Sequence, residues 1–185
     1  FQNPIIRALS SCILSTSRSI YDDIKPAPVK DYYPQSSTQQ RLFFLDRFEN
    51  IGTSYNMPMV HKVEGNLDNQ RLETAFNRLI QRQEMLRTSF EIIDENPVQK
   101  IHHDAAFEVK YYDLATEDTE KKRTIQNSFV RPFDLSYAPL LRVALIRLNE
   151  GMHLLLVDMH HIISDGTSQE ILVRDFTALY ADRVP

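Results

Sequence analysis

The segment His160-His161-Ile162-Ile163-Ser164-Asp165-Gly166 holds the side chains of this sequence that are best suited to chemistry. It follows the apolar run Leu154–Val157, which is typical of a buried strand. A histidine held at the end of such a strand can exchange a proton near neutral pH, because the ordinary pKa of imidazole is ~6.5. The segment therefore predicts general acid–base catalysis. A buried core histidine followed by a capping aspartate is the alternative, and the residues by themselves leave both open.

Strand geometry separates the two histidines. Successive side chains of a strand point to opposite faces, so His160 and His161 are not expected to reach one site. This disfavours a metal site, as does the absence of an HExxH motif or a Cys/His cluster. Asp165 is expected either to fix the imidazole tautomer by a hydrogen bond or to pair with an arginine. Gly166 is expected to supply a backbone angle that other residues resist, just before a helix N-terminus that favours a developing anion.

Other catalytic classes find little support. No GxSxG sequence surrounds Ser164 or Ser168, so a serine hydrolase is disfavoured. Cys12 has no catalytic signature around it, and no glycine-rich phosphate-binding motif is present. The pair His102-His103 has no apolar lead-in comparable to that of His160, so we expect it to lie in a surface turn.

Composition excludes some partners. The formal net charge is -4, and no basic patch of the kind that binds nucleic acid is visible. No apolar stretch approaches the ~20 residues of a membrane span, and the N-terminus does not resemble a secretion signal. A single cysteine fits a reducing, cytoplasmic compartment. The start at Phe1 suggests a piece of a longer polypeptide.

Apolar spacing predicts the elements that position the histidine segment. Helices are predicted over residues 3–20, 38–50, 68–83 and 117–129, and from Thr167 onward. The last helix is expected to bury Ile171, Leu172, Phe176 and Leu179. Strands are predicted at 57–63, 86–93, 98–102, 107–112, 140–148 and 152–160. Because helices and strands mix without strict alternation, the fold class is an α/β two-layer sandwich with a mixed β-sheet.

Four sequence motifs carry a resemblance to a known family. Met159–Ser168 resembles the HHxxxDG motif of the condensation domains of nonribosomal peptide synthetases. Ser36–Leu45 is similar to the opening motif of that family, SxAQxRLWxL, with Thr38 and Phe43 as mild departures. Arg82–Phe90 resembles RHExLRTxF, with Gln83 in place of the histidine. Pro132–Leu135, followed by Ala138-Pro139-Leu140, also matches in order and spacing.

The resemblance implies a domain organisation. Condensation domains have two similar lobes related to chloramphenicol acetyltransferase, with the active site between them. On this basis residues 32–185 form the N-terminal lobe, 21–31 an interdomain linker, and 1–20 the C-terminal helix of a preceding carrier domain. The C-terminal lobe is absent from the chain. The implied partners are upstream and downstream peptidyl carrier domains, with an adjacent adenylation domain in the parent protein.

The resemblance also implies a reaction and residue roles. An α-amine on the downstream carrier attacks the thioester on the upstream carrier, and an amide bond forms. His161 is the catalytic candidate, as a base or as a positioning group, and His160 is structural. Asp165 pairs with an arginine of the second motif, Arg82 in preference to Arg87. No cofactor binds the chain directly, because substrates arrive on phosphopantetheine arms. Without the second lobe, the isolated chain is expected to fold without catalysing.

Related functions remain as alternatives. An epimerisation domain shares the HHxxxDG motif, but we would expect a tryptophan near Ser168–Glu170, and the chain has no Trp. A heterocyclisation domain would carry aspartate in place of the histidines. A free-standing acyltransferase that uses coenzyme A is disfavoured by the carrier-like helix and the linker. A non-catalytic module that docks carriers is the alternative from another class.

Overall fold

The computed structural model describes residues 5–15, 25–49, 51–114 and 119–182. The chain divides into two compact units, residues 1–30 and 31–185. Helix α1 (Ile6–Ser15) belongs to the first unit. The helix predicted over 3–20 is present there, but its two ends, residues 3–4 and 16–20, lie outside the described residues. Its assignment to a carrier domain stays a prediction.

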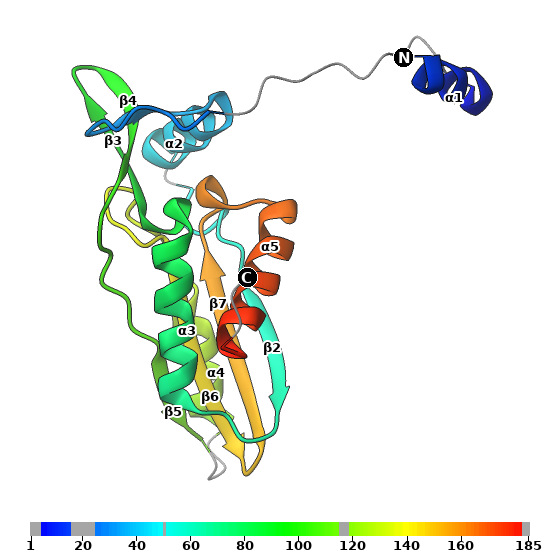
Figure 1. Cartoon of the computed structure of the whole chain (residues 1–185). Coiled ribbons are helices and arrows are strands. Elements are labelled where there is room, and N and C mark those ends of the chain that lie inside the picture. Colours follow the sequence, from blue (N-terminus) through cyan, green and yellow to red (C-terminus); the bar gives the residue numbers. More distant parts are fainter. Residues whose placement is uncertain (1–4, 16–24, 50, 115–118, 183–185) are drawn as a thin grey trace. The chain divides into compact units, whose positions relative to one another are not determined.

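A four-stranded mixed sheet lies at the centre of the second unit (Figure 1). Its order is β2 (Met59–Glu64), β7 (Met152–Met159), β6 (Leu141–Asn149) and β5 (Lys110–Asp113). β5 pairs with β6 in parallel, and the other neighbours are antiparallel. β6 and β7 form the predicted hairpin, whose turn contains Gly151 with a φ of 77°. The predicted α/β class with a mixed sheet is thereby confirmed.

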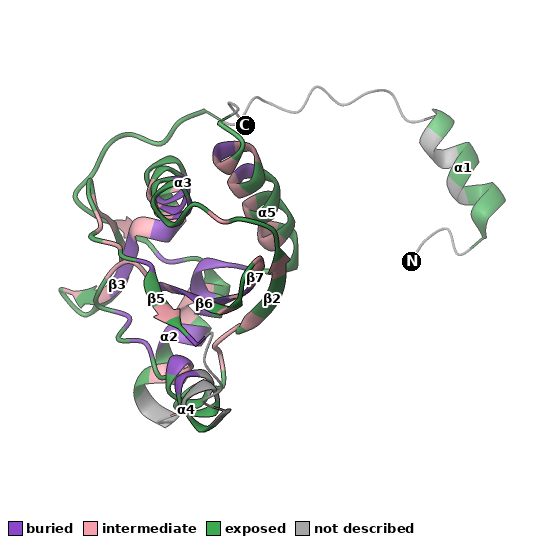
Figure 2. Cartoon of the chain, turned by 90° about the horizontal axis from the view of Figure 1, so that it is seen from below, coloured by how far each residue is buried: buried purple, intermediate pink, exposed green. Residues whose placement is uncertain are grey.

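Helices cover both faces of this sheet. α3 (Asn69–Arg82) and α5 (Gly166–Tyr180) lie next to each other on one face (Figures 1 and 2). α3 buries the stripe expected from its sequence, Leu72, Ala75, Phe76, Leu79 and Ile80. Asp68 caps α3 by accepting a hydrogen bond of 3.0 Å from the Arg71 N–H. α4 (Thr119–Phe129) packs on the other face, through a separate cluster: Leu114, Ile125, Phe129, Ala144, Ile146 and Leu156.

A smaller sheet and one helix complete the unit. The sheet has the order β1 (Tyr33–Pro34), β4 (Asn96–Ile101) and β3 (Thr88–Ile93). The β3–β4 turn places Asp94 and Glu95 at φ values of 48° and 65°, as a tight hairpin requires. Helix α2 (Ser37–Glu49) matches the predicted 38–50. The strand predicted from Leu86 is shorter, because a 3₁₀-helix, η1 (Glu84–Arg87), precedes it.

One expectation about the last helix is wrong. Ile171 is 39% exposed, although Leu172 and Phe176 pack against the core and Leu179 is buried. The reason is that α3 ends at Arg82, which pairs with Asp175, one turn further along α5 than Ile171. Ile171 there borders a hollow that Gln83 and Met85 also line.

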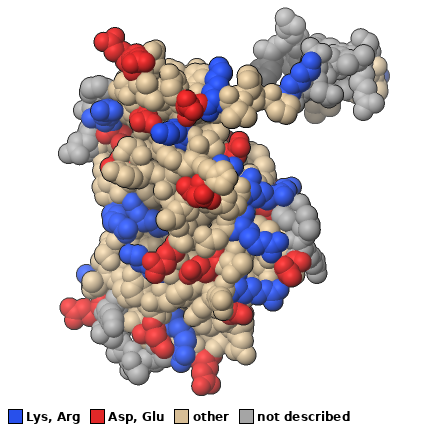
Figure 3. All heavy atoms as spheres, turned by 60° about the vertical axis from the view of Figure 1, so that its left-hand side comes forward, with Lys and Arg blue, Asp and Glu red and all other residues tan. Residues whose placement is uncertain are grey.

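The surface carries charges of both signs. On the face drawn in Figure 3, Lys and Arg atoms are interspersed with Asp and Glu atoms. Within the described ranges, none of the helices has the length and apolar character needed to span a bilayer.

Candidate active site

His160 is held in the interior at the end of β7. It is 2% exposed, and its Nδ1 accepts a hydrogen bond of 3.1 Å from the Ile162 N–H. Its ring centroid lies 6.2 Å from that of Phe133, which it meets edge-on, and 6.3 Å from that of Tyr55. Burial, and secondarily the charge of His161, lowers the pKa of His160 to about 4. The ring is therefore neutral at physiological pH, which supports a structural role.

His161 occupies the opposite situation. It begins the 3₁₀-turn η2 (His161–Ile163) and is exposed. Its backbone N–H donates to the Tyr55 carbonyl at 2.8 Å, and its Nδ1 lies 2.7 Å from the Ser164 carbonyl oxygen. A carbonyl only accepts, so Nδ1 carries a hydrogen, and in the neutral ring the lone pair is on Nε2. The expectation that the two histidines point apart is confirmed.

Asp165 does not supply the bond that orients the imidazole. It is the N-cap of α5, and its Oδ1 accepts from the Ser168 N–H at 2.8 Å and the Ser168 hydroxyl at 2.6 Å. These bonds lower the pKa of Asp165. The Ser164 carbonyl takes the role expected of Asp165, because it lies 2.7 Å from the His161 Nδ1 while Asp165 bonds to Ser168.

Gly166 also differs from expectation. The glycines with positive φ among the described residues are Gly52, Gly65 and Gly151, so Gly166 does not use a left-handed angle. A Cβ built on Gly166 would meet no atom within 4 Å. The space beside the Gly166 Cα is therefore open.

The arginines of the second motif lie elsewhere. Arg82 Nε pairs with Asp175 on α5 at 3.4 Å, and Gln83 donates to the same carboxylate oxygen at 2.8 Å. Arg87 donates to the His102 carbonyl and pairs with Glu84. The ion pair expected between Asp165 and Arg82 is not among the contacts described for these side chains. Asp165 instead bonds to Ser168, and Arg82 pairs with Asp175.

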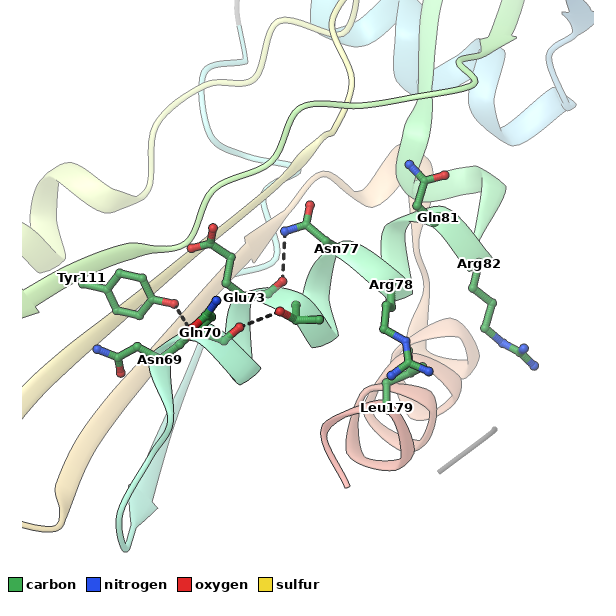
Figure 4. Close-up of a pocket in the computed structure, with 10 residues that line it drawn as sticks. Asn69, Gln70, Glu73, Asn77, Arg78, Gln81, Arg82, Tyr111 and Leu179 are labelled. Atoms are coloured by element: carbon green, nitrogen blue, oxygen red, sulfur yellow. Dashed lines mark hydrogen bonds between the residues drawn. The ribbon is translucent and has the colours of Figure 1, made fainter. Parts of the chain in front are cut away.

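Arg82 also borders a groove that is separate from the histidines. Figure 4 shows Gln81 and Arg82 in the last turn of α3, with Arg78 one turn before Arg82. The polar side of α3, Tyr111 and Leu179 line this groove. Tyr111 donates to the Asn69 carbonyl at 2.6 Å, which ties β5 to the start of α3. Neither His160 nor His161 lines it.

The opening motif, in α2, packs against the histidine segment. α2 lies against η2, and the buried residues Leu42 and Phe43 belong to the same core as Ile162 and Ile163. The fourth motif contributes Phe133 against His160. In the second pair, the His102 ring is bonded to the Ser89 hydroxyl. The His103 side chain is 96% exposed and lies beside Asp104.

Three residues outside the sequence predictions, Asp158, Arg142 and Asn56, form a polar cluster, and Asn56 forms an isolated bridge with His160. Asp158 is 0% exposed and is bonded to both Asn56 and Arg142. The signal was visible, since Asp158 is the one charged residue in the run Leu154–Met159. No group of three or more His, Cys, Asp or Glu side chains suited to a metal ion occurs among the residues that the structure describes.

Comparison with known proteins identifies the family of the chain. The family model described as the condensation domain matches residues 29–184, and the chain belongs to that family. Among the curated relatives, gramicidin S synthase 2 of Brevibacillus brevis is 49% identical over 180 residues, covering 97% of this chain and 4% of the synthase. Bacitracin synthase 2 of Bacillus licheniformis is 44% identical over 183 residues, 99% of this chain and 7% of that protein. The chain thus spans a small fraction of the length of these relatives.

Solved structures show the same fold. The starter condensation domain of the rhizomide synthetase RzmA aligns with a TM-score of 0.75 at 20% identity, covering 84% of this chain and 40% of that one. The first condensation domain of the calcium-dependent antibiotic synthetase, in complex with a substrate analogue, aligns with a TM-score of 0.73 at 24% identity, with the same two coverages.

Proposed function

We propose that this chain is the N-terminal lobe of a condensation domain that forms a peptide bond between two carrier-bound thioesters. One observation carries the proposal: His161 is exposed, and its Nδ1 lies 2.7 Å from the Ser164 carbonyl oxygen, so that in the neutral ring Nε2 has the lone pair. A lone pair of this kind can accept a proton from the attacking amine. Membership of the condensation domain family supports the choice of reaction.

The proposed step balances as an aminolysis. The amine nitrogen attacks the thioester carbonyl carbon, and a C–N bond forms as the carbonyl oxygen becomes an oxyanion. The nitrogen loses a proton to Nε2 of His161, and the C–S bond then breaks. The leaving thiolate takes a proton, so that the imidazole returns to its neutral form. If His161 only orients the amine, the same hydrogen bond serves to align it for attack.

The test compares His161→Ala and His161→Gln with the wild type in the longer synthetase that carries this chain, with both carriers loaded. We expect the amide product, followed by mass spectrometry, to fall by about 10²–10⁴-fold in both variants, the usual contribution of a positioned base. His103→Ala is the matched control, because His103 is 96% exposed and far from the site in sequence. Undiminished product in His161→Ala would contradict the proposal.

The same assay separates the alternatives. In heavy water, an epimerisation domain would exchange the α-hydrogen of a carrier-bound peptidyl group without forming an amide. A docking module would bind carriers and give neither result. We further expect the 185-residue chain alone to give no product, because it covers 40% of the solved starter condensation domain.

A further inference from the structure

We infer that Asp158, together with Arg142 and Asn56, positions the His161 imidazole by holding the backbone segments that contact the histidine pair. The inference rests on the proposed function only in taking His161 as the group at the reaction centre. Asp158 lies directly across from Arg142 in the β6–β7 ladder. Its Oδ2 accepts from Arg142 at 3.1 Å and from the Asn56 amide at 2.8 Å.

Asn56 connects this carboxylate to the catalytic candidate. The carbonyl that accepts the His161 N–H belongs to Tyr55, the residue just before Asn56. The Asn56 amide also donates to the Arg131 carbonyl at 3.0 Å, and its backbone forms an isolated bridge with His160. The hydrogen bonds of the Asn56 side chain therefore fix the Tyr55–Asn56 peptide, whose carbonyl accepts from the backbone N–H of His161.

Arg142 supports the other side of the histidine pair. Its guanidinium carbon lies 3.5 Å from the centroid of the Phe133 ring, and Phe133 meets His160 edge-on. Arg142 also donates to the Pro132 carbonyl at 2.7 Å. The loop that carries Phe133 and the loop that carries Tyr55 are thus both bonded to one buried ion pair.

Stability alone does not explain a charge at this position. Burying two ions costs desolvation, and apolar residues of similar size often serve packing as well or better. Burial indeed raises the pKa of Asp158 against the opposing effects of Asn56 and Arg142. The remaining oxygens, Asp158 Oδ1 and Asn56 Oδ1, are buried without a partner in the part of the chain described. A group kept at this cost is better explained by the geometry it imposes on His161.

The first experiment measures the His161 ring directly, by nitrogen NMR of the 185-residue chain. We expect the wild type to be in the Nδ1–H form, and Asn56→Ala and Asp158→Asn to shift a measurable fraction of His161 into the Nε2–H form. Asn96→Ala and Asp113→Asn are the matched controls. Asn96 bonds in the β3–β4 turn, and Asp113 forms an ion pair with Arg147 at 3.6 Å. Unchanged His161 signals in a folded Asn56→Ala protein would overturn the inference.

The second experiment measures the reaction in the longer synthetase. We expect Asn56→Ala to lower kcat about tenfold to a hundredfold with KM within about twofold, as misplacement of a catalytic group does. A merely structural role would lower the unfolding temperature and leave kcat of the folded enzyme unchanged, which would overturn the inference. If the wild type forms no amide, the proposed function fails, while the NMR result still decides on positioning.

Discussion

The Nδ1 atom of His161 lies 2.7 Å from the carbonyl oxygen of Ser164, three residues further along the same turn. This contact involves the backbone of Ser164 and not its hydroxyl. It gives the ring one defined tautomer within a segment of seven residues. The orientation of Nε2 depends on this turn, which packs against α2 and is held at the His161 backbone N–H by the Tyr55 carbonyl, next to Asn56.

The first prediction concerns this contact. Nitrogen NMR of the chain should show His161 with a hydrogen on Nδ1 and none on Nε2. Because the backbone carbonyl is the partner, Ser164→Ala should leave the tautomer unchanged. Asp165→Asn should leave it unchanged as well, since Asp165 is bonded to Ser168. A tautomer that changes in Asp165→Asn would show that Asp165 orients the ring after all.

The second prediction concerns the cap of α5. Asp165→Ala removes the acceptor for the Ser168 N–H and should lower the unfolding temperature, whereas Asp165→Asn keeps an acceptor and should lower it less. The pKa of Asp165 in the folded chain is lowered, so its stabilising effect is present above the unfolded pKa of ~3.9 and is lost as pH falls through the folded value.

Asp68 provides the comparison for this experiment. It caps α3 through the Arg71 N–H, and Asp68→Ala should cost about 0.5–2 kcal/mol of unfolding free energy. Thermal unfolding followed by circular dichroism measures both changes. Equal unfolding temperatures for Asp165→Ala and the wild type would contradict the role of Asp165 as a cap.

The third prediction concerns His160. Burial lowers its pKa to about 4 in the folded chain, whereas unfolded histidine titrates near ~6.5. The unfolded state therefore binds a proton first as pH falls. The unfolding free energy should decrease by up to about 3 kcal/mol between pH ~6.5 and ~4, and then level off with respect to this group.

Denaturant unfolding over this pH range measures the effect. His160→Asn should reduce the slope, because the amide oxygen can still accept from the Ile162 N–H but does not titrate. His103→Asn should leave the slope in place, since His160 remains. The same slope in His160→Asn as in the wild type would show that His160 is not the titrating group.

Local patterns determine the stripe on α3 and the cap at Asp68, and these were predicted correctly because both depend on spacing within one helix. His160 is buried and His161 exposed, as strand alternation predicts, but the strand ends at Met159 and His161 begins a 3₁₀-turn.

Long-range polar contacts were not predictable in the same way. The partner of Arg82 is Asp175, 93 positions away, and that of Asn56 is Asp158, 102 positions away. No spacing rule connects such residues, because their contact depends on how α5 and the 51–57 loop pack. The error at Ile171 has the same origin, since the point where α3 ends decides how much of α5 is covered.

The fourth prediction compares two ion pairs that share strand β6. Arg142 pairs with Asp158, whose carboxylate is 0% exposed, and Arg147 pairs with Asp113, whose side chain is 64% exposed. Arg142→Met leaves a buried carboxylate without its cation and should cost about 3–5 kcal/mol of unfolding free energy. Arg147→Met removes a solvated pair and should cost about 0–1 kcal/mol.

The cost of Arg142→Met should also depend on pH. Burial raises the pKa of Asp158, and removing Arg142 should raise it further. A carboxyl whose folded pKa is raised holds its proton in the native state where the unfolded state has lost it, so stability falls as pH rises from ~3.9 through the folded pKa. The destabilisation should therefore be smaller in acid than at pH ~7.

Adding Asp158→Leu to Arg142→Met should restore much of the loss at pH ~7, because no unpaired charge is then buried. Urea unfolding of the single and double variants measures these differences, and an Arg142→Met cost as small as that of Arg147→Met would show that the Arg142–Asp158 pair is not buried in solution.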